Sequence, residues 1–325
     1  MLDIRRLRLL RELSRRGTIT AVAEALAFTP SAVSQQLSVL EREAGVALLE
    51  RTGRRVVLTA AGIALVGHAE AVLERLERAS AELAAARTGL TGTIRIGAFP
   101  TATRAILPAA FATLAREHPG LEPMVDEIDP AEVAPRLRAG DLDVALIHEY
   151  DFVPAPPDLA LDTEDLLEEP MYLASLEEPG DSLARRRDDP WIASTPGTLC
   201  HTMTVRACQA AGFAPRIRHH IDDFTTVLAM VAAGQGVALV PELGAADPPD
   251  GVRLTELPMR RRTRIAFRRG AGAHPAVAAL IAALRSSVPP GRPPGAGGSG
   301  PAGTGGADHG VDADRRAVDG RRHRG

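Results

Sequence analysis

The side chains best suited to chemistry lie along one side of a predicted helix at residues 30–44. Thr29 is a suitable N-cap, and Pro30 fits the first helical position, where its missing N–H is not needed. Apolar residues recur every three or four positions and form one stripe, which comprises Val33, Leu37, Leu40 and Ala44. The opposite side carries hydrogen-bonding residues, namely Ser31, Ser34, Gln35, Gln36, Ser38 and Arg42, with Ser34 and Gln36 at the flanks.

Glutamine pairs with adenine in the major groove, arginine with guanine or phosphate, and serine with bases or phosphates. The polar side of residues 30–44 therefore predicts a recognition helix for double-stranded DNA. An ordinary amphipathic surface helix has the same pattern, so this helix alone leaves both interpretations open.

Arginines follow this helix on a predicted hairpin. Residues 48–58 have the pattern of a strand, a glycine-containing turn and a second strand, and they carry Arg51, Arg54 and Arg55. Arginines at this place can hold phosphates or enter the minor groove. Residues 1–60 contain ten arginines and six acidic residues, whereas the whole chain has a net charge of −3. This asymmetry favours a polyanion bound by the N-terminal part alone, although a solvated charged face would also explain it.

Two cysteines, Cys200 and Cys208, are too few for a disulfide scaffold. We expect them to be buried structural residues. The alternative is a thiol-based redox switch, because Cys200 would begin a helix beside His201, where exposure and a lowered pKa favour reactivity. Cys208 would lie about 12 Å along the same helix, so a disulfide would require that helix to unfold.

No motif indicates catalysis or a cofactor. The chain has no phosphate-binding glycine loop, no Gly-x-Ser-x-Gly motif and no metal-ligand spacing among its nine histidines. We therefore expect a protein that is not an enzyme and that holds no cofactor or metal. The alternative from another class is a cytoplasmic solute-binding protein, or an enzyme, with a fused helical domain. A nucleoid structural protein is a third alternative.

The elements that position these residues begin with three short helices and the hairpin in residues 1–58. A long helix is predicted from Thr59 to about Arg87. Apolar residues repeat along it with heptad spacing, at Leu65, Ala69, Val72, Leu76, Ala79, Leu83 and Ala86. We expect Leu65, Val72, Leu76 and Leu83 to form a dimer interface. Packing of this seam against the protein's own body is the alternative.

Strands alternate with helices after Gly92. Strands are predicted at 93–98, 122–126, 143–147, 191–194, 216–221, 237–240 and 263–268, and helices at 104–117, 200–211, 225–233 and 275–285, with a short helix ending at Gly140. This order implies parallel sheets that bind ligands at the carboxyl ends of their strands. Residues 289–325 are rich in Gly, Pro and Arg and are predicted to be disordered. No apolar run suits a membrane span or a signal peptide, so we expect a cytoplasmic protein without a membrane partner.

Several motifs, in this order and at these separations, resemble the LysR-type transcriptional regulators. They are Gly17-Thr-Ile-Thr-Ala-Val-Ala-Glu-Ala-Leu26, Thr29-Pro-Ser-Ala-Val-Ser-Gln-Gln-Leu37, Leu40-Glu-Arg-Glu-Ala-Gly45, Leu49-Glu-Arg51, Gly140-Asp-Leu-Asp-Val-Ala-Leu-Ile147 and Val231-Ala-Ala-Gly-Gln-Gly-Val-Ala-Leu-Val-Pro241. Two positions depart from the family pattern: Leu49 replaces a common Phe, and Thr29-Pro30-Ser31 replaces Ser-Gln-Pro. Base contacts are therefore carried over more safely at Ser34, Gln35 and Gln36 than in the first turn.

The resemblance implies an all-α winged helix-turn-helix, a long linker helix and an α/β effector domain of two periplasmic-binding-protein-like subdomains. The expected boundaries are 1–58, 59–90 and 91–288, with subdomain I at about 91–163 and 268–288 and subdomain II at about 164–267. The chain is expected to cross between the subdomains near residues 161–167 and 262–268. The implied partners are a partly palindromic DNA operator, a small-molecule effector and further copies of the chain, as a dimer or tetramer.

The resemblance also places an effector site in the cleft between the subdomains. By position, the residues expected to line it are Thr101, Ala102, Thr103, His148, Glu149, Thr198, Cys200, His201, Phe224 and Thr225. Two helix N-termini would face this cleft, and their free N–H groups favour an anionic effector such as a carboxylate.

Overall fold

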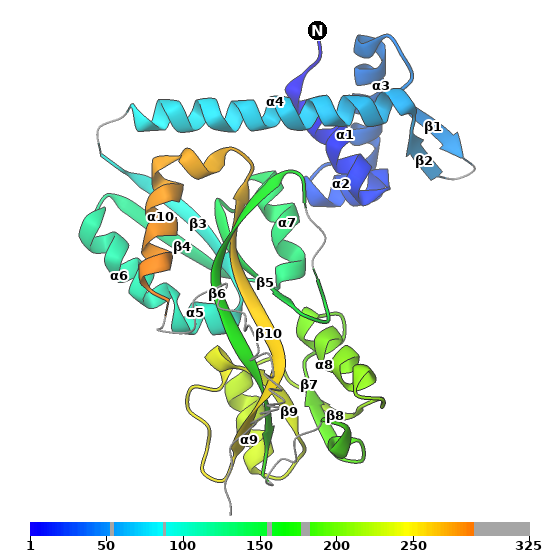
Figure 1. Ribbon diagram of the computed structural model, residues 1–325. Coiled ribbons are helices and arrows are strands. Elements are labelled where there is room, and N and C mark those ends of the chain that lie inside the picture. The colour runs from blue at the N-terminus through cyan, green and yellow to red at the C-terminus, as the bar shows by residue number, and fades with distance from the viewer. Residues whose placement is uncertain (53–54, 87–88, 155–157, 177–182, 289–325) are drawn as a thin grey trace, which may run out of the picture. The chain divides into compact units, whose positions relative to one another are not determined.

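Three helices and a two-stranded hairpin form the N-terminal part of the chain (Figure 1). They are α1 (Ile4–Arg16), α2 (Ile19–Ala25), α3 (Pro30–Ala44), β1 (Leu49–Thr52) and β2 (Arg55–Leu58). The computed structural model describes residues 1–325 except 53–54, 87–88, 155–157, 177–182 and 289–325, and the described residues fall within one compact unit. The tail predicted to be disordered and the predicted DNA contact Arg54 lie outside the described residues.

Caps explain where these helices begin and end. The side chains of Asp3, Thr18 and Thr29 each accept a hydrogen bond from a backbone amide in the first turn of α1, α2 and α3. Gly17 and Gly45 end α1 and α3 with φ of 72° and 70°, a left-handed conformation that suits glycine. The buried faces share one core, which contains Leu7, Leu10, Leu13, Val22, Val33, Leu37, Leu40 and Leu48.

The long helix α4 (Ala60–Ala85) uses two faces. Leu65 and Ala69 pack against the core of the winged helix. Leu73 and Ala81 are buried on a different face, and Glu77 on that face accepts a hydrogen bond of 3.0 Å from Arg268 of the effector domain. The linker helix is therefore held by the parts of the chain on both sides of it.

A six-stranded mixed sheet, in the order β4-β3-β5-β10-β6-β9, forms the centre of the effector domain. Its strands are β3 (Gly92–Ala98), β4 (Leu121–Glu127), β5 (Val144–Tyr150), β6 (Leu161–Ser175), β9 (Ala238–Pro241) and β10 (Arg253–Arg268). The helices of the first subdomain are α5 (Pro100–Ala105), α6 (Leu107–Glu117), α7 (Pro130–Ala139) and α10 (Pro275–Ser286). Buried side chains alternate along β3 and β5, so that α6 and α10 pack on one face of the sheet and α7 on the other.

The second subdomain adds a two-stranded parallel sheet of β7 (Pro190–Ala193) and β8 (Arg216–His220). Helices α8 (Leu199–Ala210) and α9 (Phe224–Ala232) pack against its strands and against β9. Trp191 is fully buried there, and its indole N–H donates a 3.0 Å hydrogen bond to the carbonyl of Arg186.

Two long antiparallel strands, β6 and β10, run side by side through both subdomains (Figure 1). The predicted parallel pairing is found between β3 and its neighbours β4 and β5 and between β7 and β8, but β10 pairs antiparallel with both β5 and β6. The strand predicted at 263–268 begins at Arg253, and β6 was predicted only as a crossing segment. The helix predicted at 104–117 is also divided, because Pro108 lacks the N–H that would continue α5 into α6.

A buried ion pair joins the two long strands where they pass between the subdomains. Arg261 Nε lies 2.7 Å from Glu169 Oε1, and the two side chains are 1% and 0% exposed. Glu169 Oε2 also accepts a 2.7 Å hydrogen bond from the amide of Leu243, and Arg261 donates a 3.0 Å hydrogen bond to the hydroxyl of Thr101. The guanidinium lies 5.0 Å from the centre of the Phe99 ring. Each charge is thus paired and hydrogen-bonded, as a buried charge requires.

Replacing Glu169 by Gln would leave the guanidinium of Arg261 buried without its counter-charge. We expect Glu169→Gln to lower the free energy of unfolding by about 3–5 kcal/mol. Asp165→Asn is the control, because the exposed pair of Asp165 with Arg264 should contribute within about 1 kcal/mol. Urea unfolding of both variants measures the difference, and equal losses would show that burial of the ion pair is not what matters.

Candidate functional site

The predicted recognition face of α3 is present as an open surface. Ser31, Gln35, Ser38 and Arg42 are exposed and Ser34 is half-buried, while Val33, Leu37 and Leu40 fix the helix to the core. Gln36 is also exposed, but its Oε1 accepts a 3.1 Å hydrogen bond from Arg6 of α1. Within the chain, Gln36 therefore orients the first helix as well as flanking the recognition face.

The hairpin is tied to the end of α3 by a contact that the sequence analysis missed. Glu41 Oε1 accepts hydrogen bonds of 3.0 Å from the amides of both Leu48 and Leu49. Arg51 lies in β1 opposite Val56, and Arg55 begins β2 opposite Thr52, at the turn end of the hairpin. Because the carboxylate of Glu41 is on α3 itself, it sets the position of the hairpin relative to the predicted recognition face.

A cavity of about 590 Å³ lies between the two subdomains of the effector domain. This volume is in the range of small-molecule sites. Five of the predicted effector residues line it, namely Thr101, His148, Thr198, Cys200 and Phe224. Further lining residues that the sequence analysis did not name are Phe99, Pro100, Arg104, Glu127, Ile128, Asp129, Pro130, Ser194, Asp222, Asp223 and Arg261.

The other five predicted effector residues are placed elsewhere. Ala102 is fully buried in the first subdomain, and the hydroxyl of Thr103 donates 3.3 Å to the carbonyl of Phe99. Glu149 pairs in register with Arg262 of β10. The ring of His201 packs 5.9 Å from that of His220, and exposed Thr225 accepts 2.6 Å from Arg104.

The N-termini of α7, α8 and α9 at the cleft already have side-chain acceptors, whereas that of α5, preceded by Phe99, has no side-chain cap. The hydroxyl of Thr198 caps α8 by accepting a hydrogen bond from the amide of His201. Asp223 caps α9 and Asp129 caps α7, each by accepting a 2.8 Å hydrogen bond, from the amides of Thr226 and Ala131 respectively. Of the helix starts that an anionic effector was expected to use, that of α8 is capped by a hydroxyl and that of α9 by a carboxylate. The two acids among these caps, Asp129 and Asp223, directly precede their helices, so an N-cap search of the sequence would have found them.

Neither cysteine has the environment of a reactive thiol. Cys200 Sγ lies 3.0 Å from the hydroxyl of Tyr150 and 3.9 Å from His148 Nε2, and burial raises the pKa of Cys200. Burial also raises the pKa of Cys208 to about 12. A redox-sensing cysteine needs a lowered pKa. The redox alternative is therefore not favoured over effector binding.

The heptad seam of α4 is divided between two environments. Leu65 and Ala69 contact the winged helix. The later positions Val72, Leu76 and Leu83 are 41%, 40% and 74% exposed. The face that carries Leu73 and Ala81 is buried, so the exposed part of the seam remains available to a partner helix.

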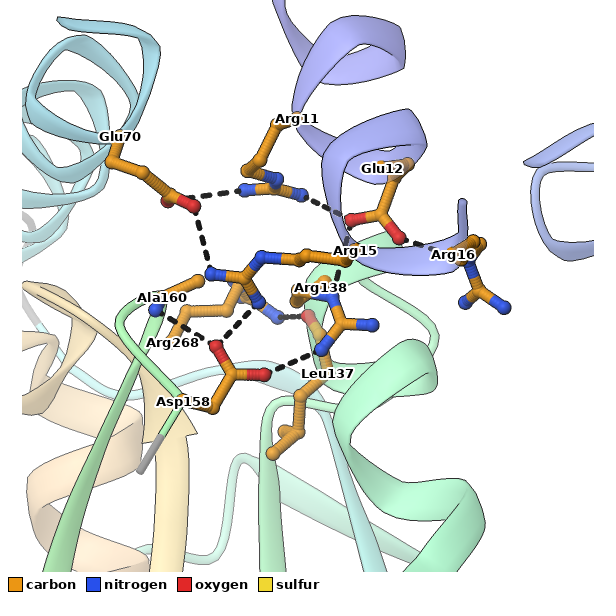
Figure 2. Close-up of polar contacts among 10 residues, drawn as sticks. All are labelled: Arg11, Glu12, Arg15, Arg16, Glu70, Leu137, Arg138, Asp158, Ala160 and Arg268. Atoms are coloured by element: carbon orange, nitrogen blue, oxygen red, sulfur yellow. Dashed lines mark hydrogen bonds and ion pairs between the residues drawn. The ribbon is translucent and has the colours of Figure 1, made fainter. Parts of the chain in front are cut away.

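A cluster of ion pairs links α1 to the effector domain (Figure 2). Glu12, with a side chain 2% exposed, pairs at 3.1 Å with Arg11, Arg16 and Arg138 of α7. Asp158 pairs with Arg138 at 2.5 Å and with Arg15 of α1. Glu70 of α4 completes the cluster by pairing with Arg15 at 2.7 Å.

Glu12 and Asp158, the two acids through which α1 and the effector domain meet, are ionised at neutral pH. Desolvation by itself would raise the pKa of Glu12, but Arg138 and Arg11 outweigh it and lower the pKa. Desolvation is likewise outweighed at Asp158, whose pKa is lowered by the amide of Ala160 and by Arg15 and Arg138. The cluster therefore holds fully charged groups between the DNA-binding and effector domains.

Comparison with known proteins identifies both domains. Residues 4–63 match the family model described as bacterial regulatory helix-turn-helix protein, lysR family, and residues 87–289 match the LysR substrate binding domain. The chain belongs to the LysR family of transcriptional regulators. It is a DNA-binding regulator with an effector-binding domain, as the sequence motifs predicted.

Curated relatives and solved structures agree with this family. The transcriptional dual regulator GltC of Bacillus subtilis is 29% identical over 276 residues, which are 81% of this chain and 89% of GltC. The nitrogen assimilation regulatory protein nac of Klebsiella aerogenes is 30% identical over 256 residues, 75% of this chain and 80% of nac. Full-length BenM, at 22% identity, shares the fold with a TM-score of 0.52 over 88% of this chain and 96% of its own. A full-length OxyR variant from Pseudomonas aeruginosa, also 22% identical, has a TM-score of 0.54 over 89% of this chain and 99% of its own.

Within the described residues, no helix combines the length and the apolar character that crossing a membrane would require.

The exposed face of α3 predicts the effect of Gln35→Ala. Loss of a bidentate contact with a base should cost about 1–3 kcal/mol at the cognate operator and relax the preference at one base pair. Ser14→Ala, at an exposed position of a different helix, α1, is the control and should leave affinity unchanged. Fluorescence anisotropy with cognate and random duplexes separates the two effects. Equal loss on both duplexes would show that Gln35 does not read a base.

The exposed part of the seam predicts the effect of Leu76→Glu. A charge at this position would be buried without a partner in a dimer, so light scattering should show dissociation into monomers. Ile63→Glu is the matched control, because Ile63 is 63% exposed on the opposite face of the same helix. If Leu76→Glu remains dimeric, the partner contacts another surface.

Proposed function

We propose that an effector bound in the cleft alters how α3 engages its operator, and that the chain acts as a non-enzymatic, cytoplasmic homo-oligomer. Two copies would bring two recognition helices to the half-sites of a partly palindromic operator. The exposed Val72, Leu76 and Leu83 of α4 support this assembly. Access to DNA is the reason for the proposed cytoplasmic location.

The effector would act by changing the relative position of the two subdomains. A ligand shifts such an equilibrium only by its difference in affinity for the open and closed cleft. The cleft is lined by both subdomains, with Thr101 and His148 from one and Thr198 and Phe224 from the other. A ligand that contacts both walls therefore binds the closed arrangement more strongly.

The ion-pair cluster of Glu12 and Asp158 is the single observation that carries this proposal. Arg138 lies on α7, whose N-terminus begins at the cleft with Asp129 and Pro130. Near the other end of the same helix, Arg138 pairs with Glu12 of the DNA-binding domain and with Asp158. Movement of α7 on effector binding would therefore reach α1 directly.

This contact has the properties of a two-state link. The side chains of Arg138 and Glu12 are 7% and 2% exposed, so separating them leaves buried charges without partners unless water enters. Such an arrangement favours either complete contact or complete separation. Effector binding would shift the balance between these two states.

The test is Asp158→Asn in the full chain. Removing this carboxylate leaves Arg15 and Arg138 facing each other, so we expect operator affinity to change by about fivefold or more without any effector. Amide hydrogen exchange in α1 should become faster at the same time. Asp126→Asn is the control, because exposed Asp126 pairs with Arg136 on the same helix α7, away from the DNA-binding domain. Unchanged operator affinity and unchanged exchange in α1 would refute the link.

A further inference from the structure

The charge of the cleft is the observation that goes beyond the proposed function. Among the described residues, four carboxylates line it: Glu127 and Asp129 on the wall of the first subdomain, and Asp222 and Asp223 on that of the second. The guanidinium groups that line it in the same part of the chain are those of Arg104 and Arg261. Both walls of the cleft therefore carry negative charge.

The two arginines do not offset these carboxylates, because Arg261 is already paired and Arg104 alone keeps an uncompensated charge among the guanidinium groups of the described lining. Arg261 is neutralised by Glu169 at 2.7 Å and is 1% exposed. Arg104 donates a 2.6 Å hydrogen bond to the hydroxyl of Thr225 and a 3.1 Å hydrogen bond to the carbonyl of Leu243. The net charge presented to a ligand is consequently negative.

The carboxylates also remove other anion sites. Asp222 accepts hydrogen bonds of 2.8 Å from the amide and 2.7 Å from the hydroxyl of Thr195. Asp129 caps α7, and Asp223 caps α9. The pKa of Asp223 is lowered, first by the amide of Thr226 and in part by Arg104, so this carboxylate is ionised at neutral pH. Glu127 is exposed at the end of β4.

A second, independent feature points to a ligand that donates hydrogen bonds. His148 lines the cleft and is 5% exposed, yet its Nδ1 has no hydrogen-bond partner among the described residues. Burial lowers the pKa of His148 well below its usual value, so the ring is neutral. In the tautomer that carries its proton on Nε2, which lies 3.9 Å from Cys200 Sγ, Nδ1 is an acceptor without a donor, and a ligand N–H would satisfy it.

We propose that the effector is a small organic cation, with an ammonium or guanidinium group held between Glu127 and Asp129 on one wall and Asp222 and Asp223 on the other. This inference rests on the proposed function of the cleft and replaces the anionic effector expected from the sequence. Throughout the described part of the chain, no three His, Cys, Asp or Glu side chains are arranged to hold a metal ion. An organic cation fits the cavity of about 590 Å³ better than a metal ion does.

The same charges explain how such a ligand closes the cleft. Carboxylates on facing walls repel one another, and the repulsion grows as the walls approach. A cation between them removes this repulsion and attracts both walls, so it binds the closed arrangement more strongly than the open one. An anion would have the opposite effect.

The test compares three probes of equal chain length on the full-length protein: 1,4-diaminobutane, butanedioate and butane-1,4-diol. In thermal unfolding at constant ionic strength, a diamine concentration well above its dissociation constant should raise the midpoint by about 2–4 °C. Butanedioate and the diol should give no shift. A shift with butanedioate, or none with the diamine, would overturn the cationic class.

Two matched variants locate the bound cation. Glu127→Gln should weaken diamine binding by about tenfold in calorimetry. Glu122→Gln, on the same exposed strand but outside the cleft, should bind as the unmodified protein does. Equal diamine affinity in both variants would place the ligand elsewhere and overturn the proposal. Failure of the Asp158→Asn test together with normal diamine binding would instead reject the link to α1 and leave the ligand class intact.

Discussion

The buried pair of Arg261 and Glu169 is the constraint on which the effector domain depends. A charge taken out of water is tolerated only when every donor and acceptor around it is satisfied. Here the partners come from both sides of the cleft, since Thr101 belongs to the first subdomain and Leu243 follows β9 in the second. The pair therefore joins the two subdomains at the base of the cleft, and it removes Arg261 from the groups available to a ligand.

A second set of buried charges, around Glu12 and Asp158, differs from the first in its exposure. Arg261 and Glu169 are almost completely shielded, and Glu12 and Arg138 nearly so, whereas Arg15 and Asp158 are 20% and 23% exposed. Water can reach the pair of Arg15 and Asp158 more easily, so this part of the cluster can separate at lower cost. The molecule thus combines a permanent junction between its subdomains with a separable contact to α1, which is the combination that a regulated DNA-binding domain needs.

The sequence predicted those parts of the fold that local rules determine. Thr29, Pro30 and Gly45 mark both ends of α3, and its apolar stripe is buried as expected. The strand β6 and the first part of β10 were missed because charged residues such as Glu164, Asp165 and Arg262 interrupt their apolar pattern, and their pairing across about a hundred residues leaves no local signal. The cleft was located by family position, but its charge depends on Glu127, Asp129 and Asp222, which converge only in the folded chain.

The charge asymmetry of the sequence also has a different meaning in the structure. Ten arginines in residues 1–60 favoured a polyanion, yet Arg11, Arg15 and Arg16 are paired with Glu12, Glu70 or Asp158, and Arg6 is paired with Glu43. Much of the positive charge of α1 is thus paired with carboxylates of the protein itself. Exposed Arg42, on the recognition face of α3, is better placed to meet phosphates or bases. A count of basic residues therefore overstates the contact with DNA, because part of that charge connects the DNA-binding domain to the domain that senses the effector.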